Sequence, residues 1–369
     1  MFHNYRIRNF NLRLVILILA LTIIGIMVIG SANEDYQNKQ ITGMVIGLVV
    51  MTVVAIVDYQ FILRFHILYY VVSLGLLVAV LFFGKTVAGA QRWLDIGVQF
   101  QPSELCKILL ILFFAQFYMQ FEEEINTPKT IIIALCLMAV PLFLIYKEPD
   151  LSTTIVTALI MASLFFSAGL SYKVAGTVVG VGVPTLAILI NMISKEGQKI
   201  LDPYQALRIQ SWIYPEKYPE SSYQQQNSIM AIGSGQLLGK GLNNDAFDSV
   251  KNGNYISEPQ TDFIFAVAGE ELGFIGCAVI ILLCLFIVLE CIHVAKGARD
   301  KAGELICIGM AAFVSFQSFV NICVVTGLMP NTGLPLPFVS YGQTSLVTLY
   351  GGMGIVLNVG LQSKRYPGT

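Results

Sequence analysis

The sequence predicts an all-α protein that crosses a membrane many times. Of its 369 residues, 56% are hydrophobic and only 12% are charged, and the mean hydropathy is +0.72. Such a composition cannot fold around one water-bounded core and is typical of integral membrane proteins. The apolar runs approach the ~20 residues that a helix needs to span a bilayer. They lack the alternation that a membrane β-barrel requires, so helices are the remaining solution.

Ten apolar runs qualify as membrane-spanning helices. The first is too long for a cleaved signal peptide and no small-x-small cleavage site follows it, so we expect a retained anchor. We therefore expect a single domain over residues 1–369 with ten transmembrane helices. In chain order the runs are residues 12–32, 40–57, 66–84, 103–121, 130–146, 151–168, 173–193, 264–293, 303–326 and 343–361.

The basic residues predict the orientation in the membrane. An even number of helices with both termini cytoplasmic leaves few Lys and Arg in the short outer loops, which agrees with the positive-inside rule. The large loop between helices 7 and 8, about residues 194–261, then lies outside the cell. The cytoplasmic residues in this arrangement are Arg6, Arg8, Arg13, Arg64, Lys129, Lys173, Lys296, Arg299, Lys301, Lys364 and Arg365, against Lys39, Lys85, Arg92 and Lys147 outside.

Cysteine and histidine give no sign of a disulfide or a dedicated metal site. All seven cysteines fall inside apolar runs, and none of the three histidines is near another ligand type in the sequence. Zinc centres and oxidised frameworks are therefore not expected. Cys277, Cys284 and Cys291 recur every seven residues and share one helix face, which favours a contact with a neighbouring helix.

The acid Asp262 is the strongest candidate for chemistry. It lies in Glu258-Pro259-Gln260-Thr261-Asp262-Phe263, where the large polar loop meets the eighth apolar run. A carboxylate at the membrane edge indicates a functional site. The alternative is that Asp262 is the N-cap of the eighth helix, which a Thr-Asp sequence at a helix start also favours.

A second pair of charges lies within the fourth run. Glu104 and Lys107 are three residues apart and share one helix face. An ion left unpaired in a membrane costs several kcal/mol, so the pair either satisfies itself as a structural element or lines the same polar cavity as Asp262.

Cations in the outer segments are candidates for binding an anion. Lys240 lies among Gly233, Gly235, Gly239 and Gly241, which allow close approach of the backbone to an anion or simply form turns. Arg92 precedes Trp93, and Arg208 is followed by Trp212. Each of these Arg–Trp pairs either binds an anionic headgroup or anchors the chain at the interface. Residues 203–213 could form a helix that lies on the bilayer.

Six blocks of the sequence together resemble one family, the SEDS proteins, which comprise the RodA, FtsW and SpoVE group of peptidoglycan glycosyltransferases, and RodA most of all. The similarity extends over nearly the whole chain. The blocks are residues 89–94 (Gly-Ala-Gln-Arg-Trp-Leu), 101–107 (Gln-Pro-Ser-Glu-Leu-Cys-Lys), 149–151 (Pro-Asp-Leu), 231–241, 258–271 and 330–342.

The resemblance implies a substrate and a set of roles. The substrate is lipid II, a disaccharide-pentapeptide carried on undecaprenyl pyrophosphate, which is polymerised into β-1,4 glycan on the outer face of the cytoplasmic membrane. Asp262 matches the family's catalytic aspartate, and Glu104 and Lys107 match its charged membrane pair. Arg92, Arg208, Lys240 and Glu258 are the expected substrate-binding residues, with Lys107 holding Asp262 ionised.

The resemblance also implies partners, and two other functions stay open. The expected partners are membrane lipid and a class B penicillin-binding protein; no nucleic-acid partner is expected. A divalent cation, Mg²⁺ or Mn²⁺, could assist the reaction, but no dedicated metal ligands are assigned. The chain could instead be a lipid II flippase whose path includes Gln317 and Asn321, or a scaffold with a small-residue surface at Gly176, Gly180 and Gly182.

Overall fold

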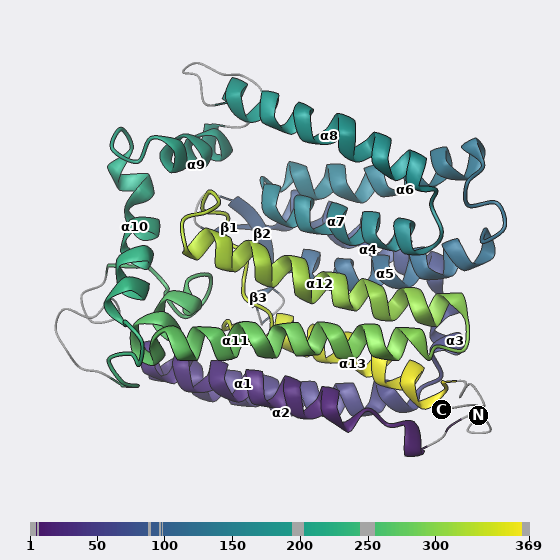
Figure 1. The fold of residues 1–369 in the computed structure, drawn as a ribbon, viewed down its shortest axis with the longest axis horizontal. Coiled ribbons are helices and arrows are strands. Elements are labelled where there is room, and N and C mark those ends of the chain that lie inside the picture. Colours follow the sequence, from purple (N-terminus) through teal and green to yellow (C-terminus); the bar gives the residue numbers. More distant parts are fainter. Residues whose placement is uncertain are drawn as a thin grey trace.

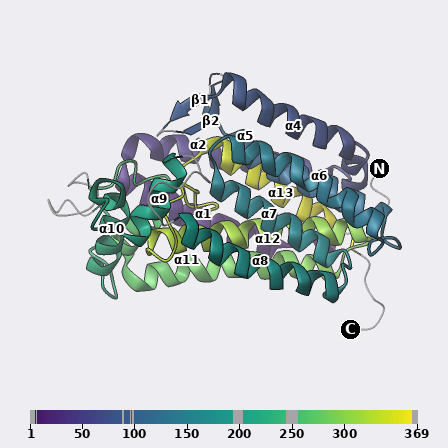
Figure 2. The same cartoon turned by 90° about the horizontal axis from the view of Figure 1, so that it is seen from above.

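The computed structural model describes residues 5, 7–87, 90–95, 97, 99–193, 203–243 and 255–363, and most of these are helical. Arg6, Lys364 and Arg365, and residues 194–202 and 244–254 of the predicted large loop, lie outside the described residues. The membrane-length helices run side by side (Figures 1 and 2). The elements are η1 (Ile7–Asn9), α1 (Leu12–Ala32), α2 (Glu34–Ile56), α3 (Tyr59–Leu63), α4 (His66–Phe83), β1 (Lys85–Val87), β2 (Ala90–Asp95), β3 (Gln99–Phe100), α5 (Pro102–Gln120), α6 (Pro128–Lys147), α7 (Leu151–Ser167), α8 (Tyr172–Ile193), α9 (Pro203–Ile213), α10 (Pro219–Ser234), α11 (Ile264–Lys296), α12 (Lys301–Val325) and α13 (Gln343–Leu361).

Each predicted apolar run coincides with one helix. Within the described residues, eight helices are long and apolar enough to cross a membrane: α1, α2, α4, α5, α6, α11, α12 and α13. Helix α7 is also apolar but has only 17 residues. The structure therefore confirms a multi-pass helical protein.

Different elements lie at the two ends of the helix bundle. The short strands and helices α9 and α10 lie at one end, and the two described ends of the chain lie at the other (Figure 1). At that second end the Asn9 amide donates a hydrogen bond to Ser363 Oγ over 3.0 Å. The cysteines predicted to share one face of α11 are all buried there, with Cys291 fully enclosed.

A small antiparallel sheet, in the order β1-β2-β3, departs from the all-α prediction. Strand β2 pairs with β1 through Lys85 and Trp93, and with β3 through Leu94 and Phe100. The strands have 6 residues at most, which is too short to give a period-two pattern that stands out between two apolar helices. The sheet carries Arg92 on its middle strand.

Helix α11 is broken near its start. Gly273 has φ 65° inside the helix. A straight helix of these 33 residues, at about 1.5 Å per residue, would extend well beyond the ~30 Å of a hydrocarbon core. The backbone groups freed by the break are satisfied by the chain that follows α10: Lys240 N donates to Glu270 O, and Phe274 N donates to Gln236 O, both over 2.9 Å. A Cβ on Gly239 would lie 2.1 Å from Glu271 O, so only glycine fits there.

The end of α12 is capped by side chains from α9 and α10. Trp212 Nε1 donates to Gly327 O over 2.8 Å, Gln225 Nε2 donates to Val324 O over 2.7 Å, and Ser228 Oγ donates to Val325 O over 2.8 Å. The last carbonyls of a helix have no partner within the helix, so these bonds satisfy them. They also fix α9 and α10 against the connection between α12 and α13.

Candidate active site

Asp262 lies just before α11, and its carboxylate is not a helix cap. The N-cap of α11 is Phe263, which makes no side-chain capping bond. The N-cap interpretation of Asp262 is therefore wrong. The side chain is half-buried, and within the part of the chain that the structure describes no group makes a hydrogen bond or direct ion pair with the carboxylate. The carboxylate is free to accept a proton.

Two predicted arginines converge with Asp262 on one point, Gly333. A Cβ placed on Gly333 would lie 3.1 Å from Asp262 Oδ2, 3.7 Å from Arg92 Nη1 and 3.8 Å from Arg208 Nη1. Gly333 has φ 74°, a conformation that suits glycine. Strand β2, helix α9, the start of α11 and the α12–α13 connection thus each bring one group to the site.

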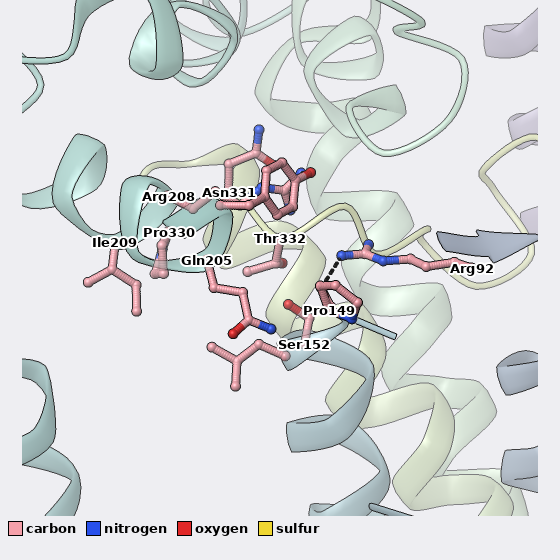
Figure 3. Close-up of a pocket in the computed structure, with 11 residues that line it drawn as sticks. Arg92, Pro149, Ser152, Gln205, Arg208, Ile209, Pro330, Asn331 and Thr332 are labelled. Carbon is pink, nitrogen blue, oxygen red and sulfur yellow. Dashed lines mark hydrogen bonds between the residues drawn. The ribbon is translucent and has the colours of Figure 1, made fainter. Parts of the chain in front are cut away.

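Arg92 is held by the segment before α7. Its Nη2 donates to Pro149 O over 2.6 Å (Figure 3). Its Nε lies 3.5 Å from Asp150 Oδ2. Asp150 is buried, and its Oδ1 caps α7 by accepting from Thr153 N over 3.0 Å. Asp150 therefore anchors the guanidinium of Arg92.

Arg208 is held by a residue one turn earlier on α9. Its guanidinium donates to Tyr204 Oη and lies over the Tyr204 ring, 4.5 Å from the ring centroid. Burial lowers the pKa of Arg208 and the nearby Arg92 lowers it further, whereas Tyr204, Asp262 and Asp150 act in the opposite direction. Arginine keeps its charge under such shifts, so the site contains two cations.

The surroundings give Asp262 the pKa of a base that works near neutral pH. The pKa of Asp262 is raised to about 6: burial raises it most, the positive charges of Arg208 and Arg92 lower it, and the negative charges of Asp150 and Glu258 raise it. A carboxyl group with this pKa is mostly ionised at pH 7 and binds a proton readily, as general-base catalysis requires.

A recess lies beside the two arginines (Figure 3). It contains about 310 Å³ of empty space, including part of the open solvent. Its lining comes from Arg92 of β2, from Pro149 and the first residues of α7, from α9 and from the α12–α13 connection. Asp262 is not part of this lining, so Arg92 and Arg208 are the groups shared by the recess and the carboxylate. An anionic group in the recess would meet both guanidinium groups.

Glu104 and Lys107 form a buried pair away from Asp262. Lys107 Nζ lies 2.7 Å from Glu104 Oε1, donates to Gln317 Oε1, and lies 4.3 Å from the centroid of the Phe313 ring. Glu104 lines a second recess with Gln317 and residues of the α12–α13 connection, where about 260 Å³ of empty space includes part of the open solvent, and Asp262 is not in that lining. Lys107 is also not among the charges that shift the pKa of Asp262. The two charges offset each other, which agrees with the structural alternative, and Glu104 Oε2 has no hydrogen-bond partner among the described residues.

The other two predicted residues differ in their relation to the site. Glu258 is exposed and close enough for its charge to raise the pKa of Asp262. Lys240 lies 2.8 Å from Glu270 at the break in α11, and it is not among the charges that act on Asp262. The geometry thus brings Arg92, Arg208, Glu258 and Asp262 together and leaves Lys240, Glu104 and Lys107 outside.

Asp150 and Gly333 are site residues to which the sequence analysis assigned no role. Asp150 stands in the Pro-Asp-Leu block, and Gly333 stands in the block at 330–342, but nothing local in either block indicates a contact with Arg92 or Asp262.

In the described ranges no three His, Cys, Asp or Glu side chains are gathered closely enough to hold a metal ion.

Comparison with known proteins agrees with the motifs. The family of FtsW/RodA/SpoVE cell cycle proteins matches residues 7–365. The chain is 34% identical to the peptidoglycan glycosyltransferase MrdB of Escherichia coli, covering 95% of this chain and 93% of that one. It is also 34% identical to the stage V sporulation protein E of Bacillus subtilis, with 96% and 98% covered.

Solved structures share the fold. A structure described as a peptidoglycan synthase complex that coordinates polymerization and crosslinking matches with a TM-score of 0.78 and 26% identity, over 95% of this chain and 97% of that one. The crystal structure of the rod shape determining protein RodA of Thermus thermophilus matches with a TM-score of 0.71 and 25% identity, over 97% and 98%. The chain therefore belongs to the FtsW/RodA/SpoVE family of cell cycle proteins.

Proposed function

We propose that this protein is a peptidoglycan glycosyltransferase that polymerises lipid II into β-1,4 glycan at the outer face of the bacterial cytoplasmic membrane. The observation that carries the proposal is the convergence of the free Asp262 carboxylate with Arg92 and Arg208 at Gly333. One base and two cations are the groups needed to join a sugar hydroxyl to a donor whose leaving group is a pyrophosphate. The family membership and the glycosyltransferase relatives support the same reaction.

In the reaction that we propose, Asp262 is the general base. The acceptor sugar hydroxyl loses its proton to the Asp262 carboxylate while its oxygen attacks the anomeric carbon of the donor. The new carbon–oxygen bond forms as the bond to pyrophosphate breaks, so undecaprenyl pyrophosphate leaves with the electron pair and the anomeric carbon is inverted. A general base must lie within about 2.6–3.2 Å of the proton donor, so the acceptor hydroxyl must bind directly at the Asp262 carboxylate.

The arginines stabilise the departing pyrophosphate. Its negative charge grows in the transition state, and cations placed in advance lower the barrier without reorganisation. Arg208 and Arg92 face both Asp262 and the recess, which makes them the first candidates for the diphosphate. Glu258 lies at the exposed side of Asp262 and is proposed to contact the sugar. Lys240, which faces Glu270, is proposed to hold the helix break that leads to the site. No step is assigned to a divalent cation.

We further propose that α7 and α8 complete a set of ten spans, with both termini cytoplasmic and the α8–α11 segment outside. The sheet, α9, α10 and Asp262 would then share the outer end of the bundle, where lipid II is displayed. The single domain would act beside a class B penicillin-binding protein that cross-links the glycan. The solved complex that coordinates polymerization with crosslinking supports a partner of this kind.

The experiment that tests this function is a gel of glycan products made by the purified protein from lipid II in detergent. Detergent leaves no second compartment, so a flippase gives no product there, whereas a polymerase gives a ladder of glycan chains. A parallel sample with metal chelator tests whether a divalent cation is needed. Failure of the wild-type protein, alone and with its transpeptidase, to make glycan would contradict the proposal.

A further inference from the structure

The loop that supplies Gly333 is held in place by buried polar side chains of α12. Asn321 Nδ2 donates to Leu334 O over 2.7 Å, and Gln317 Nε2 donates to Pro335 O over 3.1 Å. The two side chains are one helical turn apart and are each 1% exposed. Leu334 is the neighbour of Gly333, so α12 determines where the backbone of Gly333 lies.

The same Asn321 amide also holds the candidate base. Its second donor reaches the main-chain oxygen of Asp262 over 2.8 Å. Both hydrogens of one rigid, planar amide group are therefore used, one on each side of the site. Asn321 links the segment that carries Asp262 to the segment that carries Gly333, and among the described residues it makes no hydrogen bond to the Asp262 carboxylate or to an arginine.

Two more contacts join the same pair of segments. Ser340 Oγ donates to Thr261 O over 2.7 Å, and Tyr341 N donates to Gln260 O over 2.9 Å. The acceptors of these bonds are the two residues before Asp262, so the bonds fix the direction from which the chain enters the site at Asp262. Only Asn321 contacts the main chain of Asp262 itself among these groups.

We propose that Asn321 is a positioning residue for catalysis, which sets the separation between Asp262 and the Gly333 segment by binding both main chains. This inference rests on the proposed function, because it assigns Asn321 a part in the reaction of Asp262. Gln317 supports the adjacent residue Pro335, and its Oε1 accepts a hydrogen bond from Lys107.

A displaced base has a measurable consequence. The charged groups that face Asp262 are Arg208, Arg92, Asp150 and Glu258, and the two arginines lower its pKa. Both arginines approach the point that a Gly333 Cβ would occupy. When the Asn321 bonds are lost, the Asp262 segment is free to move away from Gly333 and from both guanidinium groups. The pKa of Asp262 then changes, because its burial, which raises the pKa, and the two arginine charges, which lower it, both change.

The test compares Asn321→Ala with the matched variant Asn358→Ala. Asn358 is also a buried asparagine on a membrane helix, and it donates to Ala55 O over 2.7 Å. It lies towards the end of the bundle opposite the site, on the last turns of α13 (Figure 1). Both variants lose a bond to a main-chain oxygen, so both are expected to melt at a lower temperature than the wild type. Only Asn321→Ala should change catalysis.

Initial rates of glycan formation from lipid II, divided by the amount of folded protein, give the decisive numbers. A base displaced by about 1 Å costs up to about a hundredfold, so we expect Asn321→Ala to lower kcat by about tenfold to a hundredfold. The KM for lipid II should stay close to that of the wild type, and the acid limb of the pH profile should move from its wild-type position. Asn358→Ala should keep the kcat and the pH profile of the wild type.

Several outcomes would overturn the positioning role. These are a wild-type kcat for folded Asn321→Ala, an unchanged acid limb, or equal losses in the two variants. Should Asn321→Ala fail to fold, Asn321→Ser keeps one donor in a smaller side chain, and the same kcat loss and pH shift are expected in reduced form. A wild-type protein that makes no glycan would instead contradict the proposed function, so the two failures are distinguishable.

Discussion

The substitution Gly333→Ala places one methyl group at the centre of the proposed site. Its Cβ would lie 3.1 Å from Asp262 Oδ2, which is within the distance where the acceptor hydroxyl must bind the carboxylate. The methyl group and the acceptor oxygen would therefore occupy the same space. The same carbon would lie 3.7 Å from Arg92 Nη1, so it also fills the gap between base and cation.

The expected loss has two separable parts. An L-residue at the φ of 74° found for Gly333 costs about 1–2 kcal/mol of stability. Blocking the acceptor position adds a loss of about a hundredfold or more in kcat/KM, the penalty of a misplaced reactant. Gly241→Ala separates the two, because Gly241 has φ 94° and an added Cβ there meets nothing within 4 Å.

The assay is glycan formation from lipid II alongside thermal melting of each purified variant. We expect Gly333→Ala and Gly241→Ala to lose similar stability, and only Gly333→Ala to lose activity per folded molecule. Wild-type activity in Gly333→Ala would refute the argument that the substrate approaches Asp262 across Gly333. Equal losses of activity in both variants would show that backbone strain alone explains the effect.

Three further predictions follow from the same geometry. The pKa of Asp262, at about 6, lies above that of a free aspartate, so the base is protonated below that pH. We therefore expect log kcat/KM to rise with pH up to about 6 and then to level. A profile that is flat between about pH 5 and 7 would contradict this. Arg208→Ala should lower turnover by about a hundredfold to a thousandfold, as loss of a transition-state charge partner does. Lys240→Ala removes the cation facing Glu270 and should mainly lower the melting temperature. A large loss of turnover in Lys240→Ala and a lower melting temperature in Arg208→Ala would return Lys240 to the substrate-binding residues. Lys107→Met should destabilise the protein by about 3–5 kcal/mol, because the buried Glu104 carboxylate loses its partner. Adding Glu104→Gln to this variant should recover much of the lost melting temperature. No recovery would argue against a self-satisfied pair.

The helices were predictable because the bilayer determines their length. A run of about 20 apolar residues has one stable solution in lipid, and all ten predicted runs coincide with helices. The sheet at β1 to β3 was not predictable, since its strands are too short to show a period. The break at Gly273 was equally hidden, because it depends on the backbone of Gln236 and Lys240, which are distant in sequence.

The site was predictable residue by residue but not as an arrangement. Asp262, Arg92 and Arg208 could be selected because charged residues at a membrane edge are costly and the family motifs contain them. Their partners could not be selected, because Asp150, Gly333 and Asn321 reach the site from three other elements. Lys107 shows the limit most clearly: its spacing from Glu104 was right, yet its other hydrogen-bond partner, Gln317, lies on a different helix, and Lys107 is not among the charges that act on Asp262.

The pKa of Asp262 gives one more check on the base through stability. The folded protein raises this pKa, so folding favours the protonated carboxyl, and ionisation of Asp262 destabilises the fold as the pH rises from the unfolded pKa to about 6. Asp262→Asn should therefore melt at a temperature no lower than the wild type at pH 7.5. This variant should fold as well as the wild type, which makes it a fair test of chemistry.

The most direct test of the central claim is thus glycan formation by purified Asp262→Asn, measured beside wild-type protein of equal folded amount. The side chains have nearly the same size, but the amide cannot accept the proton of the acceptor hydroxyl. We predict that the wild type makes glycan from lipid II and that Asp262→Asn makes none above background. Glycan formation at the wild-type rate by Asp262→Asn would contradict the assignment of Asp262 as the base.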